Sequence, residues 1–139
     1  MQLYKKLSVW RKAHELALRV FRATAPLYAI RQSYLAGQMR RAASSIPANI
    51  AEGTGRSTSA QFAQFLQQAL GSARELDYHL LLARDLELIA PGDHAMLEAR
   101  VDEVTKMLVA LRRTVANRPP PSKATKPRPR PSPLSPPAR

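Results

Sequence analysis

Residues 38–56, QMRRAASSIPANIAEGTGR, constrain the fold of this chain most, because they combine a helical pattern of small residues with an internal proline. Apolar residues recur in this segment at intervals of three or four, which is the spacing of one face of a helix. They are Met39, Ala43, Ile46, Ile50 and Gly53. The distance between packed helices depends on the side chains between them, so this small-residue face predicts a partner helix at close range.

Pro47 lies well inside this helical pattern. Proline has no N–H to donate to the carbonyl of Ala43, and its ring displaces that carbonyl, so we expect a kinked helix. Ser44 and Ser45 are close enough in sequence to bond the freed carbonyl groups locally. The pattern leaves an alternative open, in which Pro47 begins a new helix at its first turn, where proline costs little.

A polar stripe runs beside the apolar one at the same spacing. Its members are Arg41, Ser45, Asn49, Glu52 and Arg56. A solvated helix face usually carries Lys and Glu in pairs four residues apart, whereas this stripe mixes Ser and Asn with single charges. We therefore expect a satisfied polar network at an oligomer or partner contact. The residues assigned to that contact are Arg41, Ser45, Pro47, Asn49 and Glu52.

Glycines and hydroxyl residues predict where this helix ends and the next one begins. Gly53 or Gly55 can adopt the left-handed conformation that closes a helix. Thr58, with Gln61 three residues later, fits a capping box for a third helix. Gly71 lies in the middle of that third helix, where glycine costs about 1 kcal/mol against alanine. Close packing, beside Pro47 or between subunits, would explain it, and a merely tolerated glycine is the alternative.

Apolar periodicity predicts four helices in all. Their expected ranges are 8–25, 34–52, 59–87 and 94–115. Ser33 and Asp93 are the expected N-caps of the second and fourth helices. Short connections between helices favour antiparallel neighbours, and no segment alternates with the period of two that a strand requires. We therefore expect an all-α, up-down antiparallel four-helix bundle over residues 1–116.

Residues 117–139 have a different composition from the rest of the chain. Nine of the last 21 residues are proline, and lysines and arginines lie between them. Such a segment has little to bury, so we expect a disordered tail with polyproline II character. Its basic residues would add loose affinity for nucleic acid, and a solubilising tail without a partner is the alternative.

The segment RAASSIPANIAEGTGRS is followed by the pairs Gln61-Phe62, Phe65-Leu66, Gly71-Ser72 and Glu75-Leu76, and the chain opens with VWRKAHELA. Together these segments resemble the signature of the four-helix-bundle proteins named after the intervening sequences of bacterial 23S rRNA genes. The resemblance covers about residues 7–111 and leaves out the tail. It implies a bundle similar in fold to the accessory protein of diversity-generating retroelements, a homopentamer with a basic surface, and a role in nucleic-acid binding. It implies no catalytic residues.

The chain is strongly basic, with a net charge of +12 that is unevenly distributed. Residues 1–58 contain ten basic and two acidic residues, residues 59–116 six and eight, and residues 117–139 six and none. Excess positive charge favours polyanionic partners, chiefly nucleic acid, and a basic protein without a specific ligand is the alternative. The candidate phosphate contacts are Arg11, Lys12, Arg19, Arg22, Arg40, Arg41 and Arg56.

Residues that would support catalysis or cofactor binding form no recognisable pattern. The chain has no cysteine, no Glu-x-x-His sequence of the kind found in di-metal bundles and no glycine-rich phosphate loop. His14 lies among apolar residues, so we expect a hydrogen-bonded core histidine. Tyr28, Tyr34 and Trp10 lie near basic residues, but only 6% of the chain is aromatic and most aromatic residues have core spacing. Base stacking is therefore not favoured.

These observations predict a non-enzymatic, homo-oligomeric bundle, with a pentamer favoured, that binds nucleic acid, with RNA favoured, and needs no metal or cofactor. A protein-interaction scaffold, for example for a reverse transcriptase, is the alternative. No apolar stretch reaches the length of a signal-peptide core or of a membrane span. We therefore expect a cytoplasmic protein that makes no membrane contact.

Overall fold

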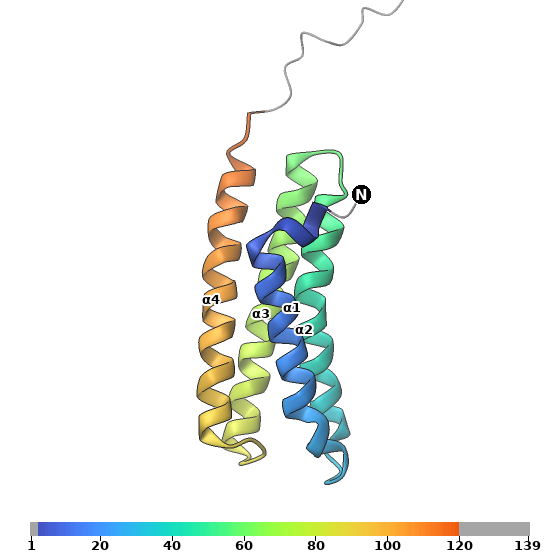
Figure 1. Cartoon of the computed structure of the whole chain (residues 1–139), viewed down its shortest axis with the longest axis vertical. Coiled ribbons are helices and arrows are strands. Elements are labelled where there is room, and N and C mark those ends of the chain that lie inside the picture. The colour runs from blue at the N-terminus through green and yellow to red at the C-terminus, as the bar shows by residue number, and fades with distance from the viewer. Residues whose placement is uncertain (1–2, 120–139) are drawn as a thin grey trace, which may run out of the picture.

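The computed structural model describes residues 3–119, which form a bundle of four long helices (Figure 1). The helices are α1 (Ser8–Thr24), α2 (Ser33–Thr54), α3 (Ser59–Asp85) and α4 (Pro91–Ala116), and the short 3₁₀ helices η1 (Leu3–Lys6) and η2 (Ala25–Tyr28) precede and follow α1. Each long helix runs opposite to the one before it, and α1 packs against α4 to close the bundle. The predicted all-α, up-down bundle is confirmed. The predicted disorder from residue 120 onward lies outside the described residues.

The core forms along the faces that the apolar spacing predicts. On α4, the side chains of Leu97, Val101, Val104 and Leu108 are buried, and Leu111 is half-buried. On the other three helices, many of the fully buried residues are alanines, which allow helix backbones to approach closely. They are Ala13, Ala36, Ala42, Ala43, Ala69, Ala73 and Ala83.

Pro47 is buried within α2, which continues as one helix from Ser33 to Thr54. The alternative in which proline begins a new helix is therefore wrong. The serine hydroxyls do not bond the carbonyl of Ala43 that Pro47 leaves free, because Ser44 donates to the carbonyl of Arg41 at 3.3 Å. The hydroxyl of Ser45 bonds other side chains instead. Packing on both flanks of α2, against α1 and α3, accompanies this continuity.

The helix starts agree only in part with the sequence. Thr58 caps α3 as predicted, and its hydroxyl accepts a hydrogen bond from the backbone N–H of Gln61 at 3.1 Å. The predicted caps Ser33 and Asp93 are wrong, since both residues lie inside the first turn of their helices. On α4 the helix starts earlier because Pro91, whose backbone angle suits a first turn, precedes Asp93.

In the described part of the chain, the residues with a left-handed backbone are not glycines. Among the described residues, positive φ angles occur at Arg31, with 61°, and at Glu87, with 58°. Each lies where a chain segment leaves a helix, and the next N–H bonds a carbonyl five residues back at 2.9 Å. Gly55 has a φ of −84°, so the predicted glycine closure of α2 is wrong.

Gly53 and Gly71 have opposite surroundings. A Cβ at Gly53 would lie 2.8 Å from Cδ1 of Phe62 and 2.9 Å from Cβ of Phe65, so α2 and α3 could not pack as closely with any other residue there. A Cβ at Gly71 would meet nothing within 4 Å. The expected close packing of Gly71 beside Pro47 is therefore wrong, and its packing between subunits stays a prediction.

We predict that alanine has opposite effects at these two glycines. Gly53→Ala forces the phenylalanines or the helices apart and should lower the free energy of unfolding by about 1–3 kcal/mol. Gly71→Ala adds a better helix former in open space and should raise it by up to about 1 kcal/mol. Thermal or urea unfolding measures both, and destabilisation of equal size at the two positions would contradict the packing described here.

Candidate nucleic-acid interface

The seven candidate phosphate contacts are distributed over α1, α2 and the connection that follows α2. Four of them are on α1, two are on α2 and Arg56 is in the connection between α2 and α3. Their contacts within the chain differ, and these contacts show which positive charges are already compensated.

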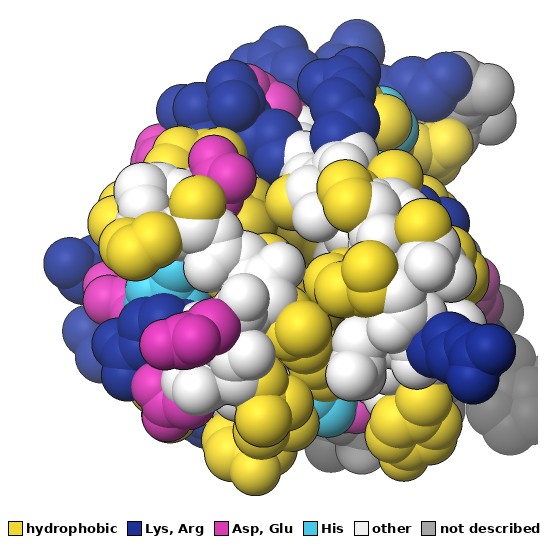
Figure 2. Space-filling model, turned by 90° about the horizontal axis from the view of Figure 1, so that it is seen from below, with side chains coloured by type: hydrophobic (Ala, Val, Ile, Leu, Met, Phe, Trp, Pro, Cys, Tyr) yellow, Lys and Arg dark blue, Asp and Glu magenta, His cyan; other side chains and the backbone are white. Residues whose placement is uncertain are grey.

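The outer face of α1, defined by Arg11, Glu15, Leu18 and Arg22, carries two cations without partners among the described residues. Arg11 and Arg22 are exposed and make no ion pair or hydrogen bond to any described residue. They are eleven residues apart, so they lie on one side of the helix about 16 Å from each other. Figure 2 shows Lys and Arg side chains gathered along the upper edge of the bundle, the side that faces the reader in Figure 1.

Lys12 and Arg19 lie on the flank of α1 that packs beside α4, and both have acidic partners. The Nζ of Lys12 is 3.0 Å from Oε1 of Glu103. Glu15 lies 3.3 Å from both Arg19 and Arg100. These exposed pairs each contribute only about 0–1 kcal/mol, but they reduce the positive potential on this flank.

Arg40 makes several contacts at the end of α1. Its Nε donates to Oγ1 of Thr24 and its Nη2 donates to the carbonyl of Phe21, each at 2.9 Å. Its guanidinium carbon lies 4.7 Å from the ring centroid of Phe21 and 4.8 Å from that of Tyr28. Arg40 therefore satisfies backbone and side-chain groups at the C-terminus of α1, and its phosphate contact stays a prediction.

The polar stripe on α2 forms a network with α3. Arg41 pairs with Glu75 of α3. The hydroxyls of Ser45 and Ser72 are 2.9 Å apart, and Nδ2 of Asn49 donates to the carbonyl of Ser45 at 2.8 Å. The stripe is thus satisfied within one chain, while its role in an oligomer or partner contact stays a prediction.

The stripe ends at Arg56. Its guanidinium is 2.5 Å from Oε1 of Glu52 and lies 4.7 Å from the ring centroid of Phe65. The residues of the α2 stripe share one face, as predicted. Their partners on α3 were not predicted, although Ser72 and Glu75 repeat at helical spacing there.

The histidines do not assemble a metal site. The prediction of a core His14 is wrong, because this residue is exposed and its ring stacks on Trp10 with centroids 5.1 Å apart. His94 is buried, and its Nε2 lies 3.5 Å from Oε2 of Glu98. Within residues 3–119, no group of three or more His, Asp or Glu side chains could hold a metal ion. None of the helices described combines the length and hydropathy of a membrane-spanning segment.

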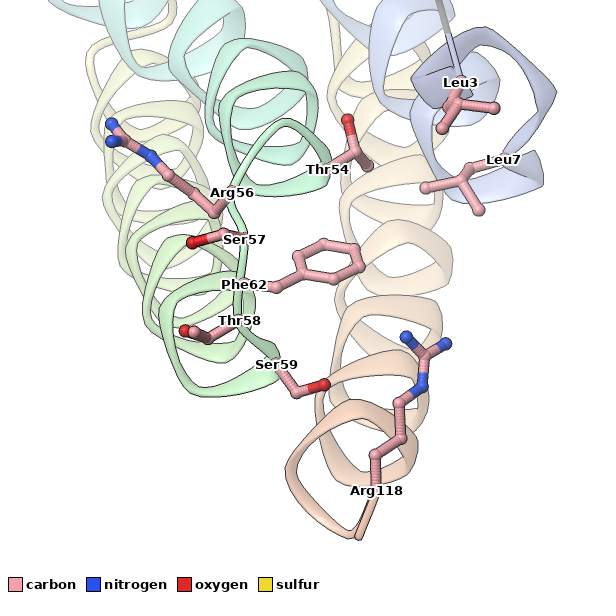
Figure 3. A pocket seen from close by; sticks show the side chains of 9 residues that line it. All are labelled: Leu3, Leu7, Thr54, Arg56, Ser57, Thr58, Ser59, Phe62 and Arg118. Carbon is pink, nitrogen blue, oxygen red and sulfur yellow. The ribbon is translucent and has the colours of Figure 1, made fainter. Parts of the chain in front are cut away.

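A recess of about 300 Å³ lies at the end of the bundle where η1, the connection between α2 and α3, and the end of α4 meet (Figure 3). Phe62 points into the recess, Leu3 and Leu7 lie opposite it, and Arg118 extends toward it from the end of α4. Arg56 lines the rim but points away. The hydroxyl residues Thr54, Ser57, Thr58 and Ser59 also line the recess, which therefore combines apolar and polar groups.

Comparison with known proteins agrees with this fold. A family model described as the 23S rRNA-intervening sequence protein matches residues 5–110. The chain belongs to this family. The resemblance seen in the sequence is confirmed.

A solved structure extends the comparison. The chain is similar to a protein of unknown function from the S23 ribosomal protein family of Bacteroides thetaiotaomicron, with a TM-score of 0.67 and 27% sequence identity. The match covers 74% of this chain and 96% of the other. No curated protein matches. The family and this neighbour have no established activity, and nothing about them indicates catalysis.

Three acidic residues, Asp77 of α3 and Glu98 and Asp102 of α4, lie near one another. The pKa of Asp77 is raised, first by burial of its carboxyl group and then by the charges of Glu98 and Asp102, while His94 acts in the opposite direction. A raised pKa means that the folded chain binds this proton more tightly than the unfolded chain. Ionised Asp77 therefore destabilises the fold, and this cost appears as pH rises through the ordinary and then the raised pKa.

We predict that Asp77→Asn raises the melting temperature at neutral pH, because it removes a partly desolvated charge beside two others. The gain should shrink below about pH 4, where the wild-type carboxyl is protonated as well. Melting curves of both proteins across pH measure the difference. A gain of constant size at all pH values would mean that the amide acts through packing instead.

Proposed function

We propose that this protein is a non-enzymatic, homo-oligomeric bundle that binds nucleic acid, with RNA as the favoured ligand. The observation that carries the proposal is the outer face of α1, where Arg11 and Arg22 have no acidic partner among the described residues. Phosphate contacts of this kind position a nucleic acid without reading its sequence.

The net charge of the chain supports the same proposal. The value of +12 is large for 139 residues, and residues 1–58 contribute +8 of it. Release of condensed counterions by each neutralised phosphate drives such binding, so affinity grows with the number of cations in contact. One copy offers few free cations on α1, and several copies would present many. Assembly into an oligomer would therefore strengthen binding. The choice of a pentamer rests on the sequence resemblance. A cytoplasmic location also stays a prediction.

We predict that binding of an RNA duplex weakens steeply with salt, by orders of magnitude between low and moderate ionic strength. Arg11→Gln with Arg22→Gln should make the slope of log affinity against log salt shallower, by about 0.7–0.9 for each phosphate that the variant no longer neutralises. Fluorescence anisotropy titrations at several salt concentrations measure this slope.

A matched control removes the same charge elsewhere. Arg112→Gln with Arg113→Gln changes two exposed arginines of α4 that likewise have no ion-pair partner among the described residues and line a depression beside α3. This control should leave the slope close to that of the wild type. Binding that does not respond to salt, or an equal loss in both variants, would contradict the proposed face.

We also predict that the purified chain is a homo-oligomer in light scattering. If the stripe of α2 contributes to contacts between copies, Asn49→Ala should shift the protein toward monomers. Within each copy the variant also lacks the 2.8 Å hydrogen bond to the carbonyl of Ser45. Retention of nucleic acid per subunit should change little. A wild-type protein that remains monomeric at high concentration would reject the oligomer.

A further inference from the structure

Aromatic side chains are exposed where α1 turns into α2. Tyr34 is 80% exposed, Tyr28 is 45% exposed and Phe21 is 39% exposed. We call these three residues the aromatic end of the bundle. Their exposure differs from what the sequence suggests, because core spacing argued against aromatic residues on the surface.

The surroundings of the aromatic end are cationic. Residues 16–51 contain five arginines and no lysine, aspartate or glutamate, although Arg19 and Arg41 have carboxylate partners outside this range. Arg31 lies in the connection itself, it is exposed, and neither it nor Arg22 has an ion-pair partner among the described residues. Arginine binds phosphate through a planar fork and stacks on flat rings, and its weak hydration favours both contacts.

Figure 2 views the bundle from this end. Asp and Glu side chains gather mostly on the left of the view, and the right side, where the connection between α1 and α2 lies, shows hydrophobic and uncharged groups with Lys or Arg at the rim. A polyanion that approaches the right side therefore meets little repulsion. This distribution favours nucleic acid over a basic protein partner.

The backbone between α1 and α2 is held in place although Tyr28 and Tyr34, at its two sides, are exposed. The backbone N–H of Gln32 donates to the carbonyl of Leu27 at 2.9 Å, and Arg31 adopts a left-handed φ of 61°. The guanidinium carbon of Arg40 lies 4.8 Å from the ring centroid of Tyr28. Neither Tyr28 nor Tyr34 forms a side-chain hydrogen bond to the residues described. Their rings are thus presented to solvent without a structural partner that would explain them, apart from the cation at Tyr28.

We propose that the aromatic end binds unpaired bases of single-stranded nucleic acid, with Tyr28 and Tyr34 stacking on bases and Arg22 and Arg31 contacting phosphates. This inference rests on the proposed function and names the form of its ligand. A ring on the protein can stack on a base only where that base is not already stacked within a duplex. Arg22 also belongs to the outer face of α1, so a strand can continue from one surface to the other.

The test compares a short oligouridine with a blunt RNA duplex of the same length. Tyr28→Ala with Tyr34→Ala should weaken oligouridine binding by about tenfold or more, within the range known for removal of base stacking, and leave duplex binding and both salt slopes nearly unchanged. Tyr28→Phe with Tyr34→Phe keeps the rings and should retain affinity for oligouridine.

Tyr78→Ala is the matched control, since Tyr78 is 58% exposed on α3, outside the aromatic end. Equal losses of affinity in this control and in the double alanine variant would overturn the inference, as would equal losses for oligouridine and duplex. If the double variant changes the mass in light scattering instead, the aromatic end is a contact between copies and the inference is wrong. A wild type that binds duplex but is insensitive to Tyr28 and Tyr34 overturns only this inference, whereas a wild type that binds neither probe also overturns the proposed function.

Discussion

The close approach of α2 and α3 is the contact on which the rest of the structure depends. Gly53 lies against Phe62 and Phe65 where the two helices meet at their connection. Fully buried alanines occur farther along both helices, which pack against each other. Only at this short separation can the hydroxyls of Ser45 and Ser72 bond each other at 2.9 Å. The small residues of the central segment therefore determine both the packing and the polar network beside it.

The network also affects where positive charge remains available. Arg41 and Arg56 on the α2 side have carboxylate partners, and so do Lys12 and Arg19 on the flank of α1 near α4. Because such exposed pairs contribute little to stability, their main consequence is the distribution of potential over the surface. Cations without a carboxylate partner among the described residues include Arg11 and Arg22 on the outer face of α1 and Arg31 at the aromatic end. Arg74, Arg112 and Arg113 on α3 and α4, the helices that carry most of the acidic residues, have no such partner either.

Periodicity predicted the four helices and their buried faces because a single period of 3.6 residues decides both. The helix ends were predicted less well, since they depend on single interactions. Pro91 moved the start of α4 ahead of Asp93, and the left-handed positions fell on Arg31 and Glu87. The role of a glycine was equally hidden, because it depends on another helix: a Cβ at Gly53 would collide with Phe62 and Phe65, whereas a Cβ at Gly71 would meet nothing within 4 Å. For the candidate interface, the sequence identified which residues are cationic but not which of them are free, since that depends on distant partners such as Glu103 and Glu75. Exposure of the tyrosines was missed for a related reason, because no neighbouring helix covers Tyr34 at the first turn of α2.

The contacts of Arg40 link the fold to the aromatic end. By bonding Thr24 and the carbonyl of Phe21, Arg40 ties α2 to the end of α1, where α1 itself provides no glycine to close the helix. The connection is thereby fixed before any ligand arrives. A binding surface that is already ordered loses less conformational freedom on association, so exposed rings on a fixed backbone bind more effectively than the same rings on a mobile loop. A structural arginine can therefore contribute to binding without touching the ligand.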